Sequence, residues 1–197
     1  MHFWSIPPAI LTITTTSNII FWVRKIFYSL TKKGNKSWSM IPTQDTTSKF
    51  TLINTVYMPE TQTLFSLSGY HGLDMQVLDQ FMSFSLAGNN NSWEYLTSAG
   101  PKVDAVLVAS YPYVYAYGGC RGFRFVKTVF CSNFSSNIMK YNVITREWTI
   151  EDTNVMRTEA EGVLTPKKAL YVYGGRNPED QLVGDLQYLG NTIQNGN

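Results

Sequence analysis

Residues 114–119 read VYAYGG, and residues 170–175 repeat this pattern as LYVYGG. Residues 64–69, LFSLSG, have the same pattern with serine in place of the first glycine. Each stretch is a short aliphatic and aromatic run, as in a buried strand, that ends at glycine. Only glycine accepts a positive φ or a close backbone approach without strain, so we expect each strand to end there beside its neighbours. The glycines concerned are Gly69, Gly118, Gly119, Gly174 and Gly175.

Tryptophan recurs between these stretches, because Trp38, Trp93 and Trp148 are 55 residues apart each time. Each tryptophan follows a polar turn, and each turn follows a strand-like run that contains aromatic residues. This order predicts two strands joined by a tight turn, which is a β-hairpin. Another strand-like run comes before each glycine stretch and ends at a proline. Each unit therefore has four expected strands: an outer first strand, the glycine strand, an aromatic strand and the tryptophan strand.

A four-stranded unit that recurs about every 50 residues is typical of a β-propeller blade. One such sheet cannot bury both of its faces alone, so the blades must pack side by side. We predict an all-β propeller that is incomplete in this chain, with about three and a half blades where closed propellers have about four to eight. The predicted divisions are a partial first blade at 1–42, blades at 43–98 and 99–152, a partial last blade at 153–190 and a tail at 191–197. In the first blade, 10–14, 21–30 and 37–41 are expected to form one strand each.

The order of these features resembles the kelch repeat: two glycines, an aromatic strand, a turn with tryptophan, and then Met156-Arg157. The resemblance covers about residues 50–190 and departs from the pattern at Ser68, where a glycine is expected. The Gly-His and Trp-Asp pairs of WD40 blades are absent from the sequence. The resemblance implies a propeller that binds partner proteins or peptides through loops at one rim.

The N-terminal residues 3–23 contain no charged residue and are followed by Arg24 and Lys25, which leaves two interpretations. A transmembrane helix needs about 20 apolar residues, and the basic pair would then keep the propeller in the cytoplasm. The alternative is a set of β-strands, which agrees with the two prolines and several threonines of this segment. We favour strands and a cytoplasmic protein, with a membrane-anchored propeller as the alternative.

The sequence contains few candidate catalytic residues. It has two histidines, far apart, and two cysteines, so we expect no metal site and no cofactor. It contains no Gly-x-Ser-x-Gly, P-loop, Cys-x-x-Cys or His-Glu-x-x-His motif. The net charge of +2 is too small to indicate a nucleic-acid partner. We therefore predict that the protein is not an enzyme and has no catalytic residues.

The two cysteines, Cys120 and Cys131, are 11 residues apart in one expected loop. A disulfide between them would agree with an exported protein, and reduced thiols would agree with an intracellular one. No clear signal peptide comes before the repeats, so we favour reduced thiols.

The segment 120–131 is the most informative about function. The separation between the glycine and the following tryptophan is 24 residues in one unit (69 to 93) and 29 in the next (119 to 148). The five additional residues lie in the segment 120–131. The segment has three basic residues, three phenylalanines and no acidic residue. Rim loops are common contact surfaces, and arginine and aromatic residues are enriched at interface hot spots. The candidate contact residues are Arg121, Phe123, Arg124, Phe125 and Lys127, with Tyr70 and His71 in the matching loop of the preceding unit.

These features together predict a protein–protein interaction module of the kelch-propeller type, which binds a partner of unknown identity through its rim loops. The alternative for the segment 120–131 is a purely structural one, a longer hairpin whose phenylalanines pack on a neighbouring blade. The alternative for the whole chain is a structural one. A fragment or half-propeller would be completed by another chain, for example by a second copy in a homodimer.

Overall fold

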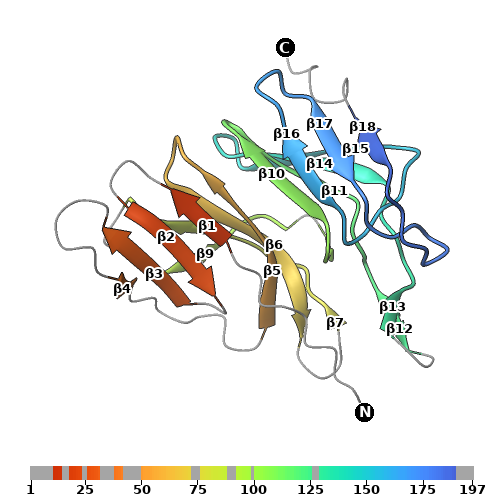
Figure 1. The fold of residues 1–197 in the computed structure, drawn as a ribbon, viewed down its shortest axis with the longest axis horizontal. Helices are drawn as coiled ribbons and strands as arrows, with labels where there is room; N and C mark the ends of the chain where they lie inside the picture. Colours follow the sequence, from red (N-terminus) through yellow and green to blue (C-terminus); the bar gives the residue numbers. More distant parts are fainter. Residues whose placement is uncertain are drawn as a thin grey trace.

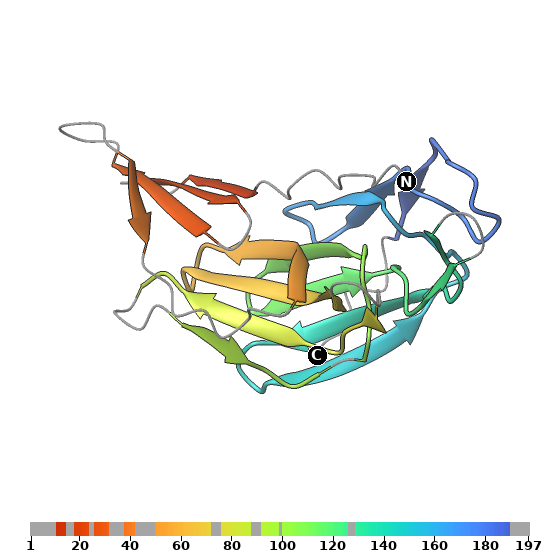
Figure 2. The ribbon, with the colours of Figure 1, turned by 90° about the horizontal axis from the view of Figure 1, so that it is seen from below.

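The computed structural model describes residues 11–14, 18–23, 26–31, 38–41, 50–71, 76–87, 92–98, 100–125 and 129–189 (Figure 1). Within these ranges the chain forms antiparallel β-sheets and no helix, as the sequence predicts. Figure 2 shows four sheets that follow one another around an arc, from the red first sheet to the blue fourth sheet.

The four sheets are the blades of a propeller. The first blade contains β1 (Leu11–Thr14), β2 (Asn18–Val23), β3 (Ile26–Thr31) and β4 (Trp38–Ile41). The second contains β5 (Phe50–Met58), β6 (Thr63–His71), β8 (Phe81–Ser85) and β9 (Trp93–Tyr95), and the short β7 (Gln76–Val77) pairs with β6. The third contains β10 (Val106–Ser110), β11 (Tyr113–Tyr117), β14 (Asn137–Asn142) and β15 (Glu147–Asp152). The fourth contains β16 (Glu161–Leu164), β17 (Leu170–Tyr173) and β18 (Leu186–Tyr188). A separate hairpin, β12 (Phe123–Phe125) and β13 (Val129–Cys131), is inserted into the third blade.

The first strands of successive blades contact one another: β1 contacts β5, β5 contacts β10, and β10 contacts β16. The first strand of each blade is therefore on the inner side of the arc, and its expected outer position is wrong. This is the arrangement of a propeller, in which blades repeat radially around a central axis.

The first blade differs from its prediction. The single strand expected over 21–30 is two paired strands, β2 and β3, with Val23 opposite Ile26. The charged residues Arg24 and Lys25 interrupt the apolar run at this point. The first blade consequently has four strands instead of three.

The described parts of the segment 3–23 form the strands β1 and β2, as the strand interpretation of this segment expects. In the part of the chain that the structure describes, no helix has the length and apolar character to cross a membrane.

Each blade in the middle of the arc is buried on both faces because side chains alternate along its strands. On β11, Val114 and Ala116 face the second blade and pack in a core with Phe65 and Phe81. The intervening Tyr115 and Tyr117 face the fourth blade. They pack in a second core with Leu170 and Val172, which are the buried side chains of β17.

The paired glycines have the backbone geometry that the sequence predicts. Gly118 and Gly119 have φ of +67° and +87°, and Gly174 and Gly175 have +69° and +88°. A Cβ at Gly119 would lie 2.7 Å from the backbone oxygen of Val103, so no larger residue fits there without a shift. Gly69 is different, because it lies inside β6 opposite Leu52. The expectation that the strand ends at Gly69 is therefore wrong.

The repeating tryptophans join strands and blades. Trp93 is buried and its ring lies against that of Phe84, with ring centroids 5.4 Å apart. Trp148 lies on the third blade and contacts Phe81 of the second, at 4.8 Å between ring centroids. Its Nε1 donates a hydrogen bond to the backbone oxygen of Thr97, at 2.8 Å. Trp38 begins β4, and its side chain lies outside the described residues.

The tryptophan packing predicts that Trp93→Ala and Trp148→Ala each lower the free energy of unfolding by about 3–5 kcal/mol, the usual range for a large aromatic removed from a core. Urea denaturation measures this loss. Tyr95→Ala is the control, because Tyr95 is exposed, and we expect a change of about 0.5 kcal/mol or less. A loss below about 1 kcal/mol at both tryptophans would contradict their place in the cores.

The surroundings of Gly119 and Gly122 predict different losses of stability when each glycine is replaced by alanine. Gly119→Ala adds a Cβ against the Val103 oxygen at a positive φ, and we expect a loss of about 2 kcal/mol or more. Gly122→Ala is the matched control, since its nearest neighbour, Ser132 Oγ, would be 3.8 Å away. Equal unfolding midpoints in urea for the two variants would show that Gly119 is not constrained.

Candidate interaction surface

One end of the propeller carries the segments that follow the paired glycines. Because β11 and β17 are equivalent strands of neighbouring blades, the residues after them lie at the same end. We call this end the glycine rim, formed by residues 118–125, 129–136 and 174–185, with the connectors 100–105 and 153–160. In Figure 1, β7 and the β12–β13 hairpin both lie at this edge.

The β12–β13 hairpin occupies the segment that the sequence singles out. Its register places Phe123 opposite Cys131, Arg124 opposite Phe130 and Phe125 opposite Val129. Two backbone hydrogen bonds continue the pairing at its base, from Arg121 N to Asn133 O at 2.8 Å and from Ser132 N to Gly122 O at 2.9 Å. The described strands of the insertion are therefore paired with each other down to their base.

A disulfide joins Cys120 to Cys131, so the expectation of reduced thiols is wrong. Pairing of the hairpin places Cys131 beside the chain that enters β12. The two Cα atoms are 5.7 Å apart, in the usual range for a disulfide. Spacing in the sequence alone could not show that the hairpin register brings these two residues together.

Arg121 precedes β12, and Phe123 and Arg124 are the first two residues of that strand. The side chains of Arg121 and Arg124 are exposed, and Phe123 is partly buried. Among the described residues, neither arginine has an acidic partner. These positive charges therefore face solvent at the glycine rim.

The remaining candidates are only partly covered by the structure. Phe125 is described in its backbone alone, and Lys127 lies outside the described residues. Tyr70 and His71 pair through their backbones with Val77 and Gln76, in a second short hairpin of the second blade. The structure does not describe their side chains, so it shows no contact between this hairpin and β12–β13.

A buried lysine lies beneath the hairpin, and the sequence analysis missed it. Lys102 is 1% exposed, and its Nζ donates to Asn137 Oδ1 at 3.0 Å. Ser135 donates to the same oxygen at 2.6 Å. Burial, together with the positive charge of Arg121, lowers the pKa of Lys102 to about 7. No motif surrounds Lys102, so only the fold could reveal this buried polar cluster.

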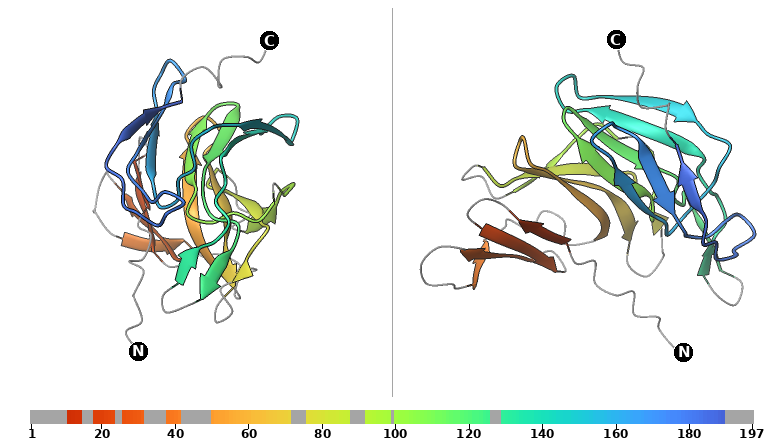
Figure 3. Two further views of the ribbon diagram at one scale, coloured as in Figure 1. Left: turned by 90° about the vertical axis from the view of Figure 1, so that its right-hand side faces the viewer. Right: turned by 45° about the horizontal axis from the view of Figure 1, so that its top comes forward.

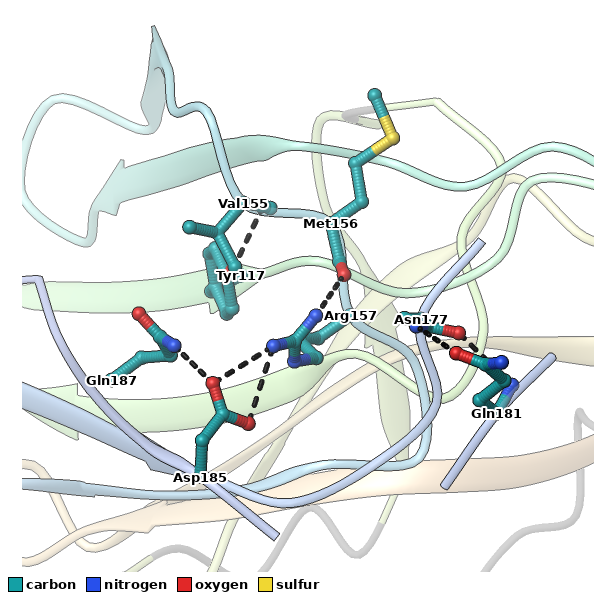
Figure 4. Close-up of polar contacts among 8 residues, drawn as sticks. All are labelled: Tyr117, Val155, Met156, Arg157, Asn177, Gln181, Asp185 and Gln187. Carbon is teal, nitrogen blue, oxygen red and sulfur yellow. Dashed lines mark hydrogen bonds and ion pairs between the residues drawn. The ribbon is translucent and has the colours of Figure 1, made fainter. Parts of the chain in front are cut away.

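The connector 153–160 joins the third blade to the fourth at the glycine rim (Figure 4). Nη2 of Arg157 lies 3.2 and 3.0 Å from the two carboxylate oxygens of Asp185. Gln187 also donates to Asp185, and this hydrogen bond, with the Arg157 contacts, lowers the pKa of the Asp185 carboxyl. Tyr117 donates to the backbone oxygen of Val155 at 2.9 Å. Arg157 is therefore a structural residue that fixes the fourth blade.

A cavity of about 500 Å³ lies at the opposite end of the second and third blades. It is lined by hydroxyl side chains such as Thr63 and Ser83 and by the Arg146–Glu94 ion pair, whose charged atoms are 3.2 Å apart. In the described parts of the chain, no group of three or more histidine, cysteine, aspartate or glutamate side chains could hold a metal ion.

The buried ammonium predicts how stability changes with pH. The pKa of Lys102 is about 7 in the folded protein and near 10.5 in the unfolded chain, so the unfolded state binds more protons between these values. We expect the free energy of unfolding of the wild type to rise, relative to Lys102→Met, as pH increases from about 7 to 10.5. Urea denaturation at several pH values measures this difference. The exposed Lys167→Met is the control, and a difference that stays constant for Lys102→Met would contradict the lowered pKa.

Comparison with known proteins agrees with this geometry. Residues 101–152 match the model of the kelch motif. The solved structure of YjhT, a kelch-type propeller, superposes with a TM-score of 0.64 at 14% sequence identity. The match covers 86% of this chain and 50% of YjhT, so the chain spans about half the length of that structure. No curated protein matches the chain in sequence. Residues 101–152, which contain the third blade, are therefore a kelch repeat, and the chain consists of blades of the kelch-type β-propeller fold.

Proposed function

We propose that this chain is a non-enzymatic protein-interaction module, which binds a partner protein through the glycine rim. The observation that carries the proposal is the disulfide-closed β12–β13 hairpin, which presents Arg121 and Arg124 to solvent. The kelch repeat supports an interaction role in general, because propeller blades hold variable loops on a rigid frame.

The hairpin is suited to binding because its described strands, β12 and β13, are already paired. A two-stranded hairpin alone is marginally stable in water, and here the Cys120–Cys131 disulfide and the base hydrogen bonds hold it. Strands that are already paired lose less conformational entropy when they bind. The disulfide therefore favours recognition by a fixed surface.

The charge of the hairpin favours an acidic partner. The segment 120–131 contains three basic residues and no acidic one. Arginine donates paired hydrogen bonds to carboxylates, and such charge-assisted bonds are among the stronger ones in interfaces. We infer that the partner presents aspartate or glutamate side chains to Arg121 and Arg124.

The disulfide is also relevant to the cellular compartment in which the protein resides. Disulfides persist in oxidising compartments and are rare in the cytosol. The Cys120–Cys131 bond therefore supports an oxidising compartment as the alternative to the cytoplasmic location expected from the sequence.

Charge reversal tests the proposed binding surface. We expect Arg121→Glu/Arg124→Glu to weaken binding of a partner captured from source cells by about tenfold or more, or about 1.4 kcal/mol. Calorimetry or surface plasmon resonance measures the Kd. The matched control is Lys167→Glu/Lys168→Glu, a reversal of two charges in the β16–β17 turn at the opposite end.

In the Lys167/Lys168 control we expect the free energy of unfolding to stay within about 0.5 kcal/mol of the wild-type value, because these are surface changes. The Arg121/Arg124 variant should also stay folded, and it removes a positive charge that lowers the pKa of the buried Lys102. Binding that is unchanged by the Arg121/Arg124 reversal, or lost equally in the Lys167/Lys168 control, would overturn the assignment of the binding surface to the hairpin.

A further inference from the structure

The cavity opposite the glycine rim lies between the second and third blades. Its wall on the second blade comes from β6, β8, β9 and the turn before β6, and its wall on the third blade consists of Tyr141, Val143 and Arg146. The right view of Figure 3 shows these two blades, gold to olive and green to cyan, side by side. Of the described residues of the innermost strands, β5 and β10, none lines the cavity. The cavity therefore lies away from the propeller axis, between the outer strands of the two blades.

Strand register places small hydroxyl side chains together on one face of the second blade. Thr63 lies opposite Ser85, and Phe65 lies opposite Ser83. Ser83 in turn lies opposite Glu94 of β9. Residues that are directly opposite each other in an antiparallel pair share a face. This face is the one that packs on the third blade, because Phe65 is part of the core between the two blades.

The third blade carries large side chains at the equivalent positions. The alignment of LFSLSG with VYAYGG equates Thr63 with Tyr113, and strand pairing equates Ser83 with Lys140. Nζ of Lys140 lies 4.0 Å from the centre of the Tyr113 ring, so these two side chains pack on each other. The second blade has two small hydroxyl residues in place of this pair. The difference in side-chain size explains why a cavity is present between the second and third blades.

Two buried hydroxyls of the lining have no partner in the described parts of the chain. Ser83 and Tyr141 are 8 and 1% exposed, and neither hydroxyl forms a hydrogen bond with another described residue. Most buried polar side chains in proteins have a hydrogen-bond partner. Burial raises the pKa of the Tyr141 hydroxyl, the charge of Arg146 lowers it, and the charge of Glu94 raises it. This hydroxyl therefore lies near both charges of the ion pair.

The Arg146–Glu94 ion pair lies where the cavity opens to solvent, because its side chains are 64 and 58% exposed. The contact joins one guanidinium nitrogen, Nη1, to one carboxylate oxygen, Oε1, at 3.2 Å. A guanidinium has five N–H donors and a carboxylate has two acceptor oxygens, so both groups retain capacity for further hydrogen bonds. The pair has no net charge, and it therefore favours neither an anion nor a cation.

These groups define the chemistry of a matching ligand. A hydroxyl both donates and accepts, a carboxylate only accepts, and a guanidinium only donates. A ligand that satisfies all three carries several hydroxyls and no net charge. The apolar side chains of Phe65, Leu96 and Val143 also line the cavity and suit the C–H face of a ring. The cavity volume of about 500 Å³ is within the usual range of about 300–1,000 Å³ for small-molecule sites.

We propose that this cavity binds a neutral saccharide, with Ser83, Tyr141 and the Arg146–Glu94 pair as its hydrogen-bonding groups. A sugar ring combines many hydroxyls with an apolar C–H face, as the lining requires. The site lies at the opposite end from the β12–β13 hairpin and does not depend on the function proposed above.

Saturation-transfer NMR of the full chain tests the class of ligand. The neutral probes are glucose, galactose, mannose, N-acetylglucosamine and their disaccharides, at up to about 10 mM. The charged analogues glucuronate and glucosamine are the controls. We expect saturation transfer to at least one neutral sugar and weaker transfer to its charged analogues. Transfer to no neutral sugar, or to the charged analogues alone, would overturn the proposal.

Filling the cavity tests the location of the site. Thr63→Tyr/Ser83→Lys gives the second blade the side chains that the third blade has at these positions. We expect the Kd for the neutral sugar with the strongest saturation transfer, measured by calorimetry, to rise about a hundredfold or more, because the space is occupied. Thr149→Tyr, an equal enlargement at an exposed threonine outside the lining, is the control. An unchanged Kd in the filled variant, or an equal loss in the control, would overturn the assignment.

A second pair of variants does not depend on packing. Glu94→Gln and Arg146→Gln change exposed side chains, and each should raise the same Kd about tenfold or more, since charge-assisted hydrogen bonds are lost. Full affinity in both variants would overturn the role of the ion pair. The Arg121→Glu/Arg124→Glu variant should bind the sugar as the wild type does, so failure of rim binding and failure of saccharide binding are distinguishable.

Discussion

The blades in the middle of the arc are covered on both faces, and the remaining features of the structure depend on this packing. The strand β11 shows how this is achieved. Val114 and Ala116 are buried toward the second blade, and Tyr115 and Tyr117 are buried toward the fourth. Small side chains on one face and large ones on the other allow each pair of sheets to pack closely. No blade of this kind is stable as an isolated sheet, so stability belongs to the interfaces between blades.

Close contact between blades in turn requires the glycines and the connectors. The backbone oxygen of Arg157 accepts a hydrogen bond from Gly119 N at 2.7 Å, and Glu159 N donates to Asp104 O at 3.1 Å. These bonds join consecutive blades at the glycine rim, and the Arg157–Asp185 ion pair holds the same connector from the other side. The glycine rim therefore carries two sets of residues. Arg157 and Asp185 hold the connector between blades, whereas Arg121 and Arg124 on the β12–β13 hairpin face solvent.

The repeat structure could be predicted from the sequence because it depends on local patterns. The paired glycines need a positive φ, and the tryptophans mark hairpins, so both features have a direct signature in the residues. The division of 21–30 into two strands was missed, since both halves are apolar and only Arg24 and Lys25 separate them. Gly69 was misplaced because the pairing of β6 with β7 extends the ladder beyond the glycine.

The candidate site could be predicted only in part. The additional residues and the basic charge of 120–131 are visible in the sequence. The Cys120–Cys131 bond depends on hairpin register, and the burial of Lys102 against Asn137 depends on residues 35 positions apart. Non-local contacts of this kind leave no pattern at fixed spacing.

The matching of successive blade faces also has a consequence for evolution. Because the third and fourth blades carry equivalent residues on their outward faces, a tandem duplication of one repeat would add a blade that already fits its neighbours. The number of blades in such a gene can therefore change in a single genetic event, whereas a change within one blade must be matched by changes in both adjacent blades.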